Sequence, residues 1–242
     1  MHALSFGQAA SLYDAIRPSY PDEAIQYALG TEPVHVVDIG AGTGLLSRQL
    51  VAQGHELTVV EPDEGMLSQL RENLPNVKSH QAPAEEIPLA ENSLDAAVAG
   101  QAFHWFDPDK ALPEIKRVLR PGGTFAPMWN VRDESVEWVT AMSEVVGTSS
   151  ADHTAAIASQ PGFFGPHFEE PELKKFRHEY QINGDGLIKL MQSRSYYLTA
   201  DEKGKAELTA KLEELIGTHP DLRGKNTFAL PYVTYVFKMI NR

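Results

Sequence analysis

The chain has 242 residues, of which 42% are hydrophobic and 22% are charged, and its formal net charge is −12. This composition excludes disorder, and no apolar run approaches the roughly 18 residues of a membrane span. A strongly negative chain without a basic patch is repelled by phosphate backbones, so we expect no nucleic-acid partner. The absence of cysteine excludes disulfides, thiolate catalysis and cysteine metal ligands.

The first residues have neither the basic start nor the apolar stretch of a secretory signal, so we expect a cytoplasmic location. The histidines His153, His167, His178 and His219 show no metal-ligand spacing, and we therefore predict no metal site. The length suits a single domain spanning residues 1–242.

Residues 1–30 are predicted to form two helices on either side of a break at Arg17-Pro18-Ser19-Tyr20-Pro21, because proline and serine interrupt the helical spacing of apolar residues. We expect Tyr13, Arg17 and Tyr20 to form an N-terminal lid over the ligand site. The alternative is an amphipathic helix with an exposed arginine.

The stretch Val36–Gly44 combines a short apolar run with three glycines at alternate positions, Gly40, Gly42 and Gly44. Such a run predicts a buried strand that turns sharply into a helix starting near Leu45. Glycine permits the positive φ of the turn and a close approach of a ligand. The backbone N–H groups at the start of the helix favour an anionic or electron-rich ligand group.

Strand and helix patterns then alternate through Glu56–Glu61, 64–73 and 77–81 to the small apolar run 93–100. This alternation predicts a parallel sheet with right-handed crossovers. Ligands of such sheets lie beyond the carboxyl ends of the strands.

The second half of the chain contains further helix and strand patterns, including helical patterns over 186–197 and 199–217. Asp107-Pro108 predicts a helix start, and Pro113 predicts a kink or restart because an interior proline costs about 3 kcal/mol. Strands are expected over the ranges 124–129, 173–182 and 226–239.

The glycine spacing decides between two kinds of cofactor. A dinucleotide fingerprint, G-x-G-x-x-G/A, would place its third glycine at Leu45, whose bulk is incompatible with that position. The observed pattern is Asp38 followed by G-x-G-x-G. It resembles the first motif of the class I S-adenosylmethionine-dependent methyltransferases.

Further motifs in the same order strengthen this resemblance. Glu61 lies where the acid of that family binds both ribose hydroxyls, and its two acceptor oxygens suit a vicinal diol. Pro62 follows it, and Met66 lies one turn further on, where it can pack against the adenine.

The segment 83–89 resembles the adenine-contacting segment of the family, except that Pro83 replaces the usual Asp, Ser or Thr. The proline removes a side-chain acceptor and a backbone N–H, so the resemblance implies that Ala84 and Glu85 contact the adenine. The segments 93–97 and 119–123 resemble the motifs of the fourth and fifth strands.

The resemblance implies a Rossmann-like α/β fold: a seven-stranded, mostly parallel sheet with its last strand antiparallel, helices on both faces and a small helical cap. Residues 34–130 would form the cofactor-binding core. Residues 131–170 and 184–217 would supply the cap around the methyl acceptor.

The stretch Gln101-Ala102-Phe103-His104-Trp105-Phe106 follows the fourth strand. In the family this loop lies between the methionine part of the cofactor and the acceptor, so the resemblance places Gln101 at the cofactor and Trp105 at the acceptor. Its His-Trp-Phe form resembles the small-molecule subgroup of trans-aconitate-type and ubiquinone-biosynthesis methyltransferases. His104 is the candidate acid, base or acceptor-orienting residue; the alternative is a structural histidine among core aromatics.

Arg132, Arg194, Tyr196 and Tyr197 lie in the segments expected to form the cap. An arginine there can bind a substrate carboxylate through two parallel hydrogen bonds. The alternative is a solvated surface arginine.

We therefore predict an enzyme that transfers a methyl group from S-adenosylmethionine to a small molecule. A carboxylate oxygen is the favoured acceptor, and a quinone or phenol carbon or oxygen is the second. Two other classes remain: a nicotinamide-dependent oxidoreductase, which Leu45 disfavours, and a protein that binds the cofactor without catalysis.

Overall fold

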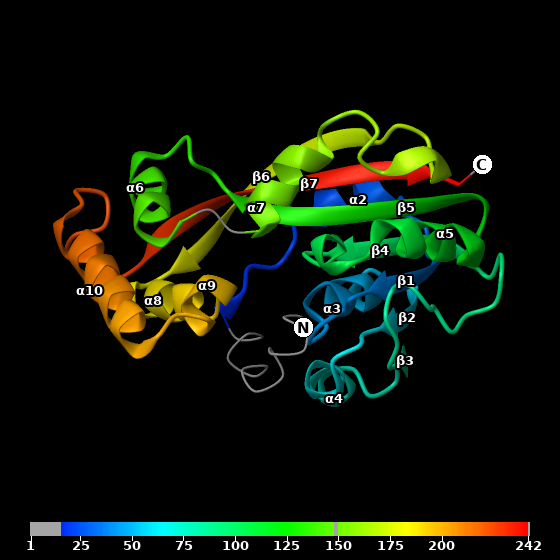
Figure 1. Ribbon diagram of the computed structural model, residues 1–242, viewed down its shortest axis with the longest axis horizontal. Helices are drawn as coiled ribbons and strands as arrows, with labels where there is room; N and C mark the ends of the chain where they lie inside the picture. Colours follow the sequence, from blue (N-terminus) through cyan, green and yellow to red (C-terminus); the bar gives the residue numbers. More distant parts are fainter. Residues whose placement is uncertain (1–15, 148–149, 242) are drawn as a thin grey trace.

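The computed structural model describes residues 16–147 and 150–241. A seven-stranded sheet with the order β3-β2-β1-β4-β5-β7-β6 runs through the molecule (Figure 1). Its strands are β1 (His35–Ile39), β2 (Glu56–Val60), β3 (Lys78–His80), β4 (Leu94–Gly100), β5 (Leu119–Arg132), β6 (Glu172–Ile182) and β7 (Phe228–Ile240). The first five strands are parallel, and β7 is antiparallel to both β5 and β6. The predicted Rossmann-like fold is confirmed.

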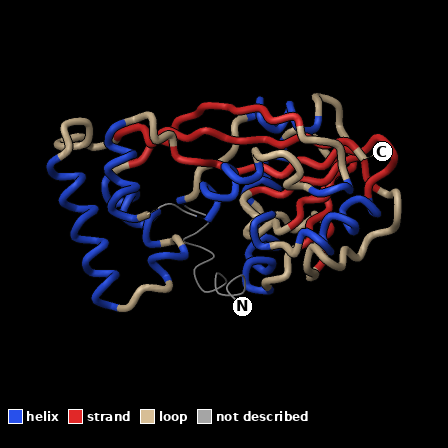
Figure 2. Tube along the Cα trace, turned by 45° about the horizontal axis from the view of Figure 1, so that its top comes forward, coloured by secondary structure: helices blue, strands red, loops and turns tan. Residues whose placement is uncertain are grey.

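Helices cover both faces of the sheet (Figure 2). On one face lie α2 (Asp22–Leu29), α3 (Leu45–Ala52) and α4 (Glu64–Asn73), whose apolar residues share a buried cluster with alternate residues of the strands. On the other face α5 (Pro108–Val118) and α7 (Ser150–Ala158) contribute to a second cluster. The parallel strands are thus covered on both sides, as their nearly continuous apolar runs require.

Helix α5 is continuous through Pro113, so the predicted restart near Leu112 does not occur. The proline lies in the second turn, where it removes one backbone hydrogen bond. Four buried side chains on the inner face of α5 offset that loss by packing against the sheet. They are Ala111, Leu112, Ile115 and Val118.

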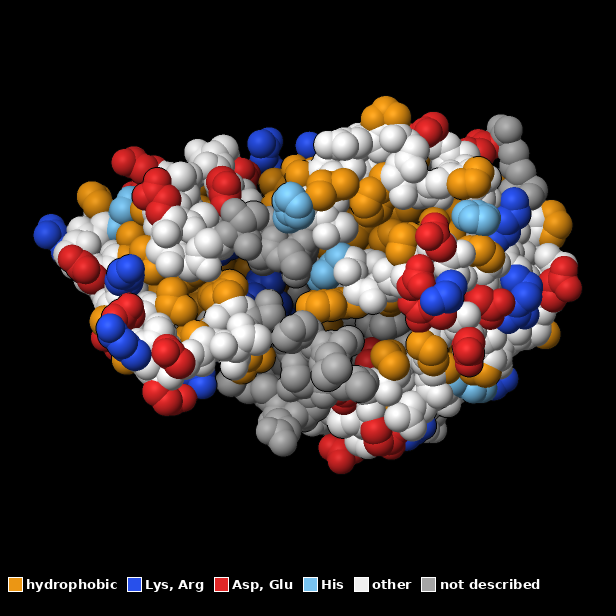
Figure 3. Space-filling model, in the orientation of Figure 1, with side chains coloured by type: hydrophobic (Ala, Val, Ile, Leu, Met, Phe, Trp, Pro, Cys, Tyr) orange, Lys and Arg blue, Asp and Glu red, His pale blue; other side chains and the backbone are white. Residues whose placement is uncertain are grey.

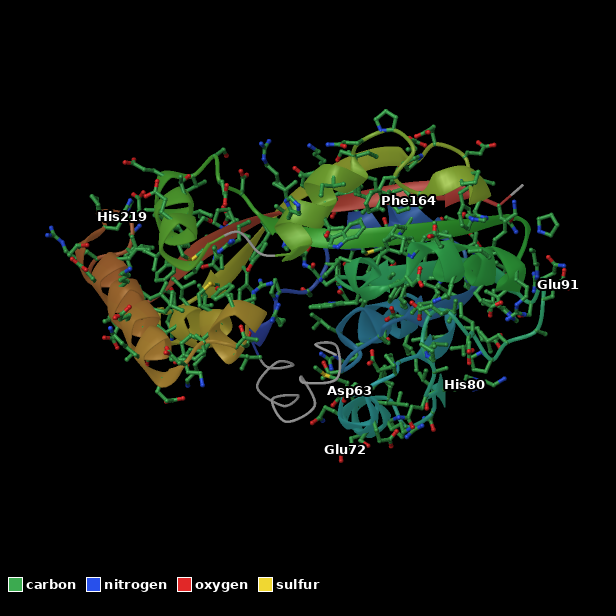
Figure 4. All side chains as sticks on the ribbon, in the orientation of Figure 1. Asp63, Glu72, His80, Glu91, Phe164 and His219 are labelled. Carbon is green, nitrogen blue, oxygen red and sulfur yellow. The ribbon has the colours of Figure 1, made fainter. Side chains whose placement is uncertain are left out.

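Beyond the core, four helices form a second lobe, here called the cap lobe (Figure 1). They are α6 (Glu137–Val146), α8 (Gly184–Gln192), α9 (Ser195–Leu198) and α10 (Glu202–Thr218). Apolar residues of α6, α8 and α10 share a third buried cluster with the outer ends of β6 and β7. His219, which follows α10, marks the far end of this lobe in Figure 4.

The segment 131–170, expected to form part of the cap, divides between the two lobes. Helix α6 belongs to the cap lobe, but the segment that contains α7 packs on the sheet. Ala155, Ala158, Phe164 and Phe168 are buried in the same cluster as the inner face of α5, and Phe164 lies over the core strands (Figure 4). The aromatic-rich turn after α7 therefore serves the core, because its rings pack against one another and against β5 and β7.

Strand β5 is longer than β4 and carries the sheet into the cap lobe. The last residue of β4, Gly100, pairs with Met128, and β5 continues to Arg132, which pairs with Tyr232 of β7. Side chains alternate between the faces of a strand, so Asn130 and Arg132 lie on the same face of this extension. The polar end of β5 thereby stands between the two lobes, beyond the carboxyl end of β4.

Within the described residues, no helix combines the length and apolar character needed to cross a membrane.

Candidate active site

The turn between β1 and α3 contains the three predicted glycines, all with positive φ: 68° at Gly40, 57° at Gly42 and 89° at Gly44. A Cβ on Gly40 would lie 2.7 Å from Cβ of Ala102, and one on Gly44 would lie 3.0 Å from Cγ of Leu70. At Gly42 a Cβ would meet nothing within 4 Å. Gly40 and Gly44 therefore allow close packing within the protein, whereas Gly42 faces open space beside the helix start.

Glu61, directly after β2, is bound to this turn. Its Oε2 accepts a hydrogen bond from the Gly42 N–H at 2.8 Å, and its Oε1 accepts one from the Asp63 N–H at 2.9 Å. Burial raises the pKa of the Glu61 carboxyl, and the two backbone donors oppose that effect. Asp63 in turn accepts from the Met66 N–H at the start of α4, near the label in Figure 4. The carboxylate is thus fixed in position next to Gly42.

Asp38, near the end of β1, is almost completely buried, with 1% of its surface exposed. Its Oδ2 accepts a hydrogen bond from the Ser47 hydroxyl at 2.7 Å, whereas its Oδ1 has no hydrogen-bond partner within the described residues. Burial raises the pKa of Asp38 to about 7, and the charge of Glu61 contributes to the rise. A buried carboxylate oxygen without a donor suits a cationic or hydrogen-bond-donating ligand group.

The other predicted cofactor residues lie around the same strand ends. The Ala41 N–H and the Pro62 carbonyl make hydrogen bonds within the protein, to Val60 and Gln81 respectively. The Met66 side chain is buried in α4, with 5% of its surface exposed.

In the segment 83–89, Ala84 is buried, and Oε1 of Glu85 accepts a hydrogen bond from the Asp107 N–H at 2.7 Å. The Glu85 side chain thus stabilises the start of α5.

Gln101 connects β4 to the extension of β5. It has a φ of 56°, unusual for a residue with a side chain. Its backbone N–H donates to the Met128 carbonyl at 2.9 Å, and its Nε2 donates to the Asn130 carbonyl at 2.8 Å. Strained backbone of this kind is concentrated at functional sites, and here it starts the loop that carries His104.

His104 lies in a single turn of 3-10 helix, η3 (Phe103–Trp105). The indole Nε1–H of Trp129 donates a hydrogen bond to Nδ1 of His104 at 3.3 Å. Because the indole can only donate, Nδ1 must be the acceptor, and the imidazole is neutral with its proton on Nε2. Phe103 is buried in the core, whereas Trp105 is 41% exposed and its ring lies 4.9 Å from that of His104.

Three arginines lie near the hydroxyl of Tyr196, between the lobes. Burial raises the pKa of the Tyr196 hydroxyl, and the charges of Arg194, Arg132 and Arg17 oppose that rise. The Tyr196 hydroxyl donates to Sδ of Met191 at 3.1 Å. Lys and Arg side chains are visible in the hollow between the lobes (Figure 3). The structure thus brings together the predicted residues Arg17, Arg194 and Tyr196, while Tyr13 lies outside the described residues.

Polar residues that the sequence did not single out complete this region. The Asn130 Nδ2 donates to the carbonyl oxygens of Pro18 and Ser19, and its Oδ1 accepts from the Thr234 hydroxyl at 2.6 Å and lies 3.3 Å from Nε2 of His178. The only sequence signal was a polar side chain within an otherwise apolar strand pattern. Tyr232, for which the sequence predicts only a place in a strand, is completely buried, and its ring stacks on that of His178.

Comparison with known proteins assigns the chain and its fold to a family. A methyltransferase domain model matches residues 37–126. An uncharacterized methyltransferase of Mycobacterium tuberculosis is 40% identical over 236 residues, which cover 96% of this chain and 93% of the relative. The structure of a proposed type II methyltransferase from Anaeromyxobacter dehalogenans superposes with a TM-score of 0.69 at 25% identity, covering 93% of this chain and 97% of that one.

A malonyl-[acyl-carrier protein] O-methyltransferase of Methylococcus capsulatus is also similar, with 37% identity over 135 residues, 51% of this chain and 49% of the relative. This chain belongs to the class I S-adenosylmethionine-dependent methyltransferases. Its cofactor is S-adenosylmethionine, and the nicotinamide-dependent alternative is thereby set aside. The residues present fit that cofactor, because the open face of Gly42 adjoins a fixed carboxylate at Glu61 and the unpartnered buried oxygen of Asp38.

Proposed function

We propose that this enzyme methylates a carboxylate oxygen of a small-molecule acid. The observation that carries the proposal is the hydrogen bond from Trp129 Nε1 to His104 Nδ1. It fixes the histidine of the acceptor loop as a neutral imidazole with its proton on Nε2. A histidine in that state donates a hydrogen bond and orients an acceptor oxygen, but it does not remove a proton from the acceptor through either nitrogen.

The reaction needs no base when the acceptor is a carboxylate. S-adenosylmethionine supplies, when bound, an electrophilic methyl group on a positively charged sulfur that becomes neutral when the methyl leaves. Carboxylic acids ionise near pH 4, so a carboxylate meets that methyl group already deprotonated. A phenol ionises near pH 10 and would require a residue that accepts its proton.

We assign three roles to the residues around the β1–α3 turn. Glu61 would accept hydrogen bonds from the ribose hydroxyls, and Gly42 would leave room for the methionine part of the cofactor. Asp38 would stand near the ammonium group of the methionine. Pre-set positions of this kind suit a reaction that depends mainly on alignment, which alone can contribute about 7–11 kcal/mol.

Two further observations support an oxygen acceptor that is not a nucleic acid. The Methylococcus capsulatus relative is by name an O-methyltransferase, and it resembles this chain over about half of its length. The net charge of −12 disfavours a nucleic-acid acceptor.

The test uses S-adenosylmethionine with a labelled methyl group and a panel of small carboxylic acids, phenols and quinols. A methyl ester releases labelled methanol on brief treatment with alkali, whereas a methyl ether or a C-methyl product keeps its label. We expect alkali-labile label with at least one acid. Label that survives alkali, on a phenol or a ring carbon, would overturn the proposal and support the second candidate acceptor.

A further inference from the structure

A row of polar side chains crosses the three long strands between the lobes. Arg132 of β5 pairs with Tyr232 of β7, and Tyr232 pairs with His178 of β6, so the three residues are neighbours on one face of the sheet. The rings of His178 and Tyr232 are stacked, with centroids 5.7 Å apart. Arg132 is 94% buried by the lobes, with 6% of its surface exposed.

Positive charge is concentrated at this row. Arg17, from the N-terminal segment, and Arg194, from the cap lobe, act with Arg132 on the same Tyr196 hydroxyl. Arg17 is tied to the cap lobe by a hydrogen bond from its Nη2 to the Ser193 carbonyl, and Arg132 is tied by one to the Gly147 carbonyl. Three arginines from three separate segments thus lie near one tyrosine in a protein whose net charge is −12.

The Tyr232 hydroxyl is an independent sign of a missing ligand. Tyr232 has no exposed surface, and within the described residues its hydroxyl has no hydrogen-bond partner. A buried hydroxyl left without a partner costs about 1–3 kcal/mol. An anionic oxygen bound among the arginines would accept the hydrogen bond that Tyr232 can donate.

We infer that Arg17, Arg132, Arg194 and Tyr232 form an anion site for a second anionic group of the acceptor, distinct from the carboxylate that receives the methyl group. This inference rests on the proposed function. The reacting carboxylate loses its negative charge as the ester forms, so arginines bound to it would stabilise the ground state more than the transition state. A second anion keeps its charge throughout, and the same arginines can hold it without slowing the reaction.

The position of the site along β5 sets the size of the acceptor. Trp129, which binds His104, precedes Arg132 by three residues, so the two side chains point to opposite faces of β5. Their Cα atoms are roughly 10 Å apart along the strand, because an extended strand rises about 3.3 Å per residue. Both the distance and the opposite faces favour an acid whose two anionic groups are several bonds apart, rather than two groups on one carbon.

The experiment compares the diacids succinate, glutarate and adipate with monocarboxylates of the same chain lengths. Binding is measured by thermal stabilisation of the cofactor-free protein, and transfer by alkali-labile label. The variants are Arg194→Gln and Tyr232→Phe, with Arg132→Gln as a third. Arg223→Gln, which removes an exposed arginine beyond α10, is the matched control. Retained binding of S-adenosylhomocysteine shows that each variant has folded.

We expect at least one diacid to bind at least tenfold more tightly than its matched monoacid. Arg194→Gln and Tyr232→Phe should remove most of that preference, while Arg223→Gln should keep it. Equal binding of diacids and monoacids, or loss of preference in the control alone, would overturn the anion site. Diacid binding that depends on the arginines but yields no ester would support the anion site and count against the proposed function alone. Ester formation that the variants do not affect would support the proposed function and count against the anion site.

Discussion

Glu61 is oriented by the protein before any cofactor binds, because two backbone N–H groups hold its oxygens. We predict that Glu61→Gln lowers the affinity for S-adenosylhomocysteine by about 10- to 100-fold, the usual value of hydrogen bonds to a charged group. Isothermal titration calorimetry measures this directly. The ribose is the expected partner because a carboxylate accepts from both of its hydroxyls, whereas an amide offers only one acceptor oxygen.

Glu56→Gln is the matched control, because Glu56 begins the same strand that Glu61 follows and its side chain is 74% exposed. It should leave the affinity unchanged. Equal affinities for wild type and Glu61→Gln would remove Glu61 from the cofactor site.

The three glycines of the β1–α3 turn make different demands at the same positive φ. A Cβ costs about 1–2 kcal/mol at each of them through backbone strain. At Gly40 it also collides with Ala102 at 2.7 Å. We predict that Gly42→Ala loses cofactor affinity but little stability beyond that strain, whereas Gly40→Ala loses clearly more stability. Urea unfolding and titration with S-adenosylhomocysteine separate the two effects, and equal unfolding free energies would refute the distinction.

At the scale of elements, the extension of β5 holds the N-terminal segment in place through Asn130. The buried Asn130 amide donates to the carbonyls of Pro18 and Ser19 and accepts from Thr234. We predict that Asn130→Ala lowers the free energy of unfolding by about 1–3 kcal/mol, because it leaves buried groups unpaired. It should also speed amide hydrogen exchange at residues 16–20, because the tether to that segment is lost.

Thr234→Val is the control for this tether, since it removes only the hydroxyl that donates to Asn130 Oδ1. Its stability should fall, but exchange at residues 16–20 should stay slow. Unchanged exchange in Asn130→Ala would show that other contacts hold the segment.

The candidate cofactor site was predictable because its residues lie at the ends of strands that can be recognised from the sequence. Asp38 lies near the end of β1, Gly42 follows β1 and Glu61 follows the neighbouring strand β2, so their place at one sheet edge follows from the parallel topology. The fold was predictable from the alternation of strand and helix patterns.

The proposed anion site was not predictable, because Arg132 and Tyr232 are brought together by pairing between strands about 100 residues apart. Arg17 is held in this region by its hydrogen bond to the Ser193 carbonyl of the cap lobe. The sequence of β5 itself does not indicate that this strand extends beyond the end of β4. Pro113 shows that a local signal can also mislead: proline disfavours the interior of a helix, but the buried side chains of α5 pack well enough to keep the helix continuous.

At the scale of the whole molecule, Asp38 couples stability to cofactor binding. Its pKa rises from 3.8 to about 7 on folding, mainly through burial. Between these values the folded protein binds a proton that the unfolded chain has released, so the free energy of unfolding falls as the pH rises through this window. The contribution is complete above pH 7 and amounts to a few kcal/mol. A cationic group beside Asp38 favours the ionised form, so the cofactor should offset this loss.

Asp38→Asn tests this coupling, because asparagine keeps an acceptor for Ser47 but cannot ionise. We predict that the variant melts higher than wild type above pH 7, by on the order of 10 °C, and that the difference vanishes near pH 4. The other carboxyl groups are common to both proteins, so their effect on the pH dependence of melting cancels in the comparison. The affinity of wild type for S-adenosylmethionine should rise from pH 6 to pH 8, while that of the variant stays low and flat. A melting difference independent of pH would mean that Asp38 is ionised in the folded protein throughout this range.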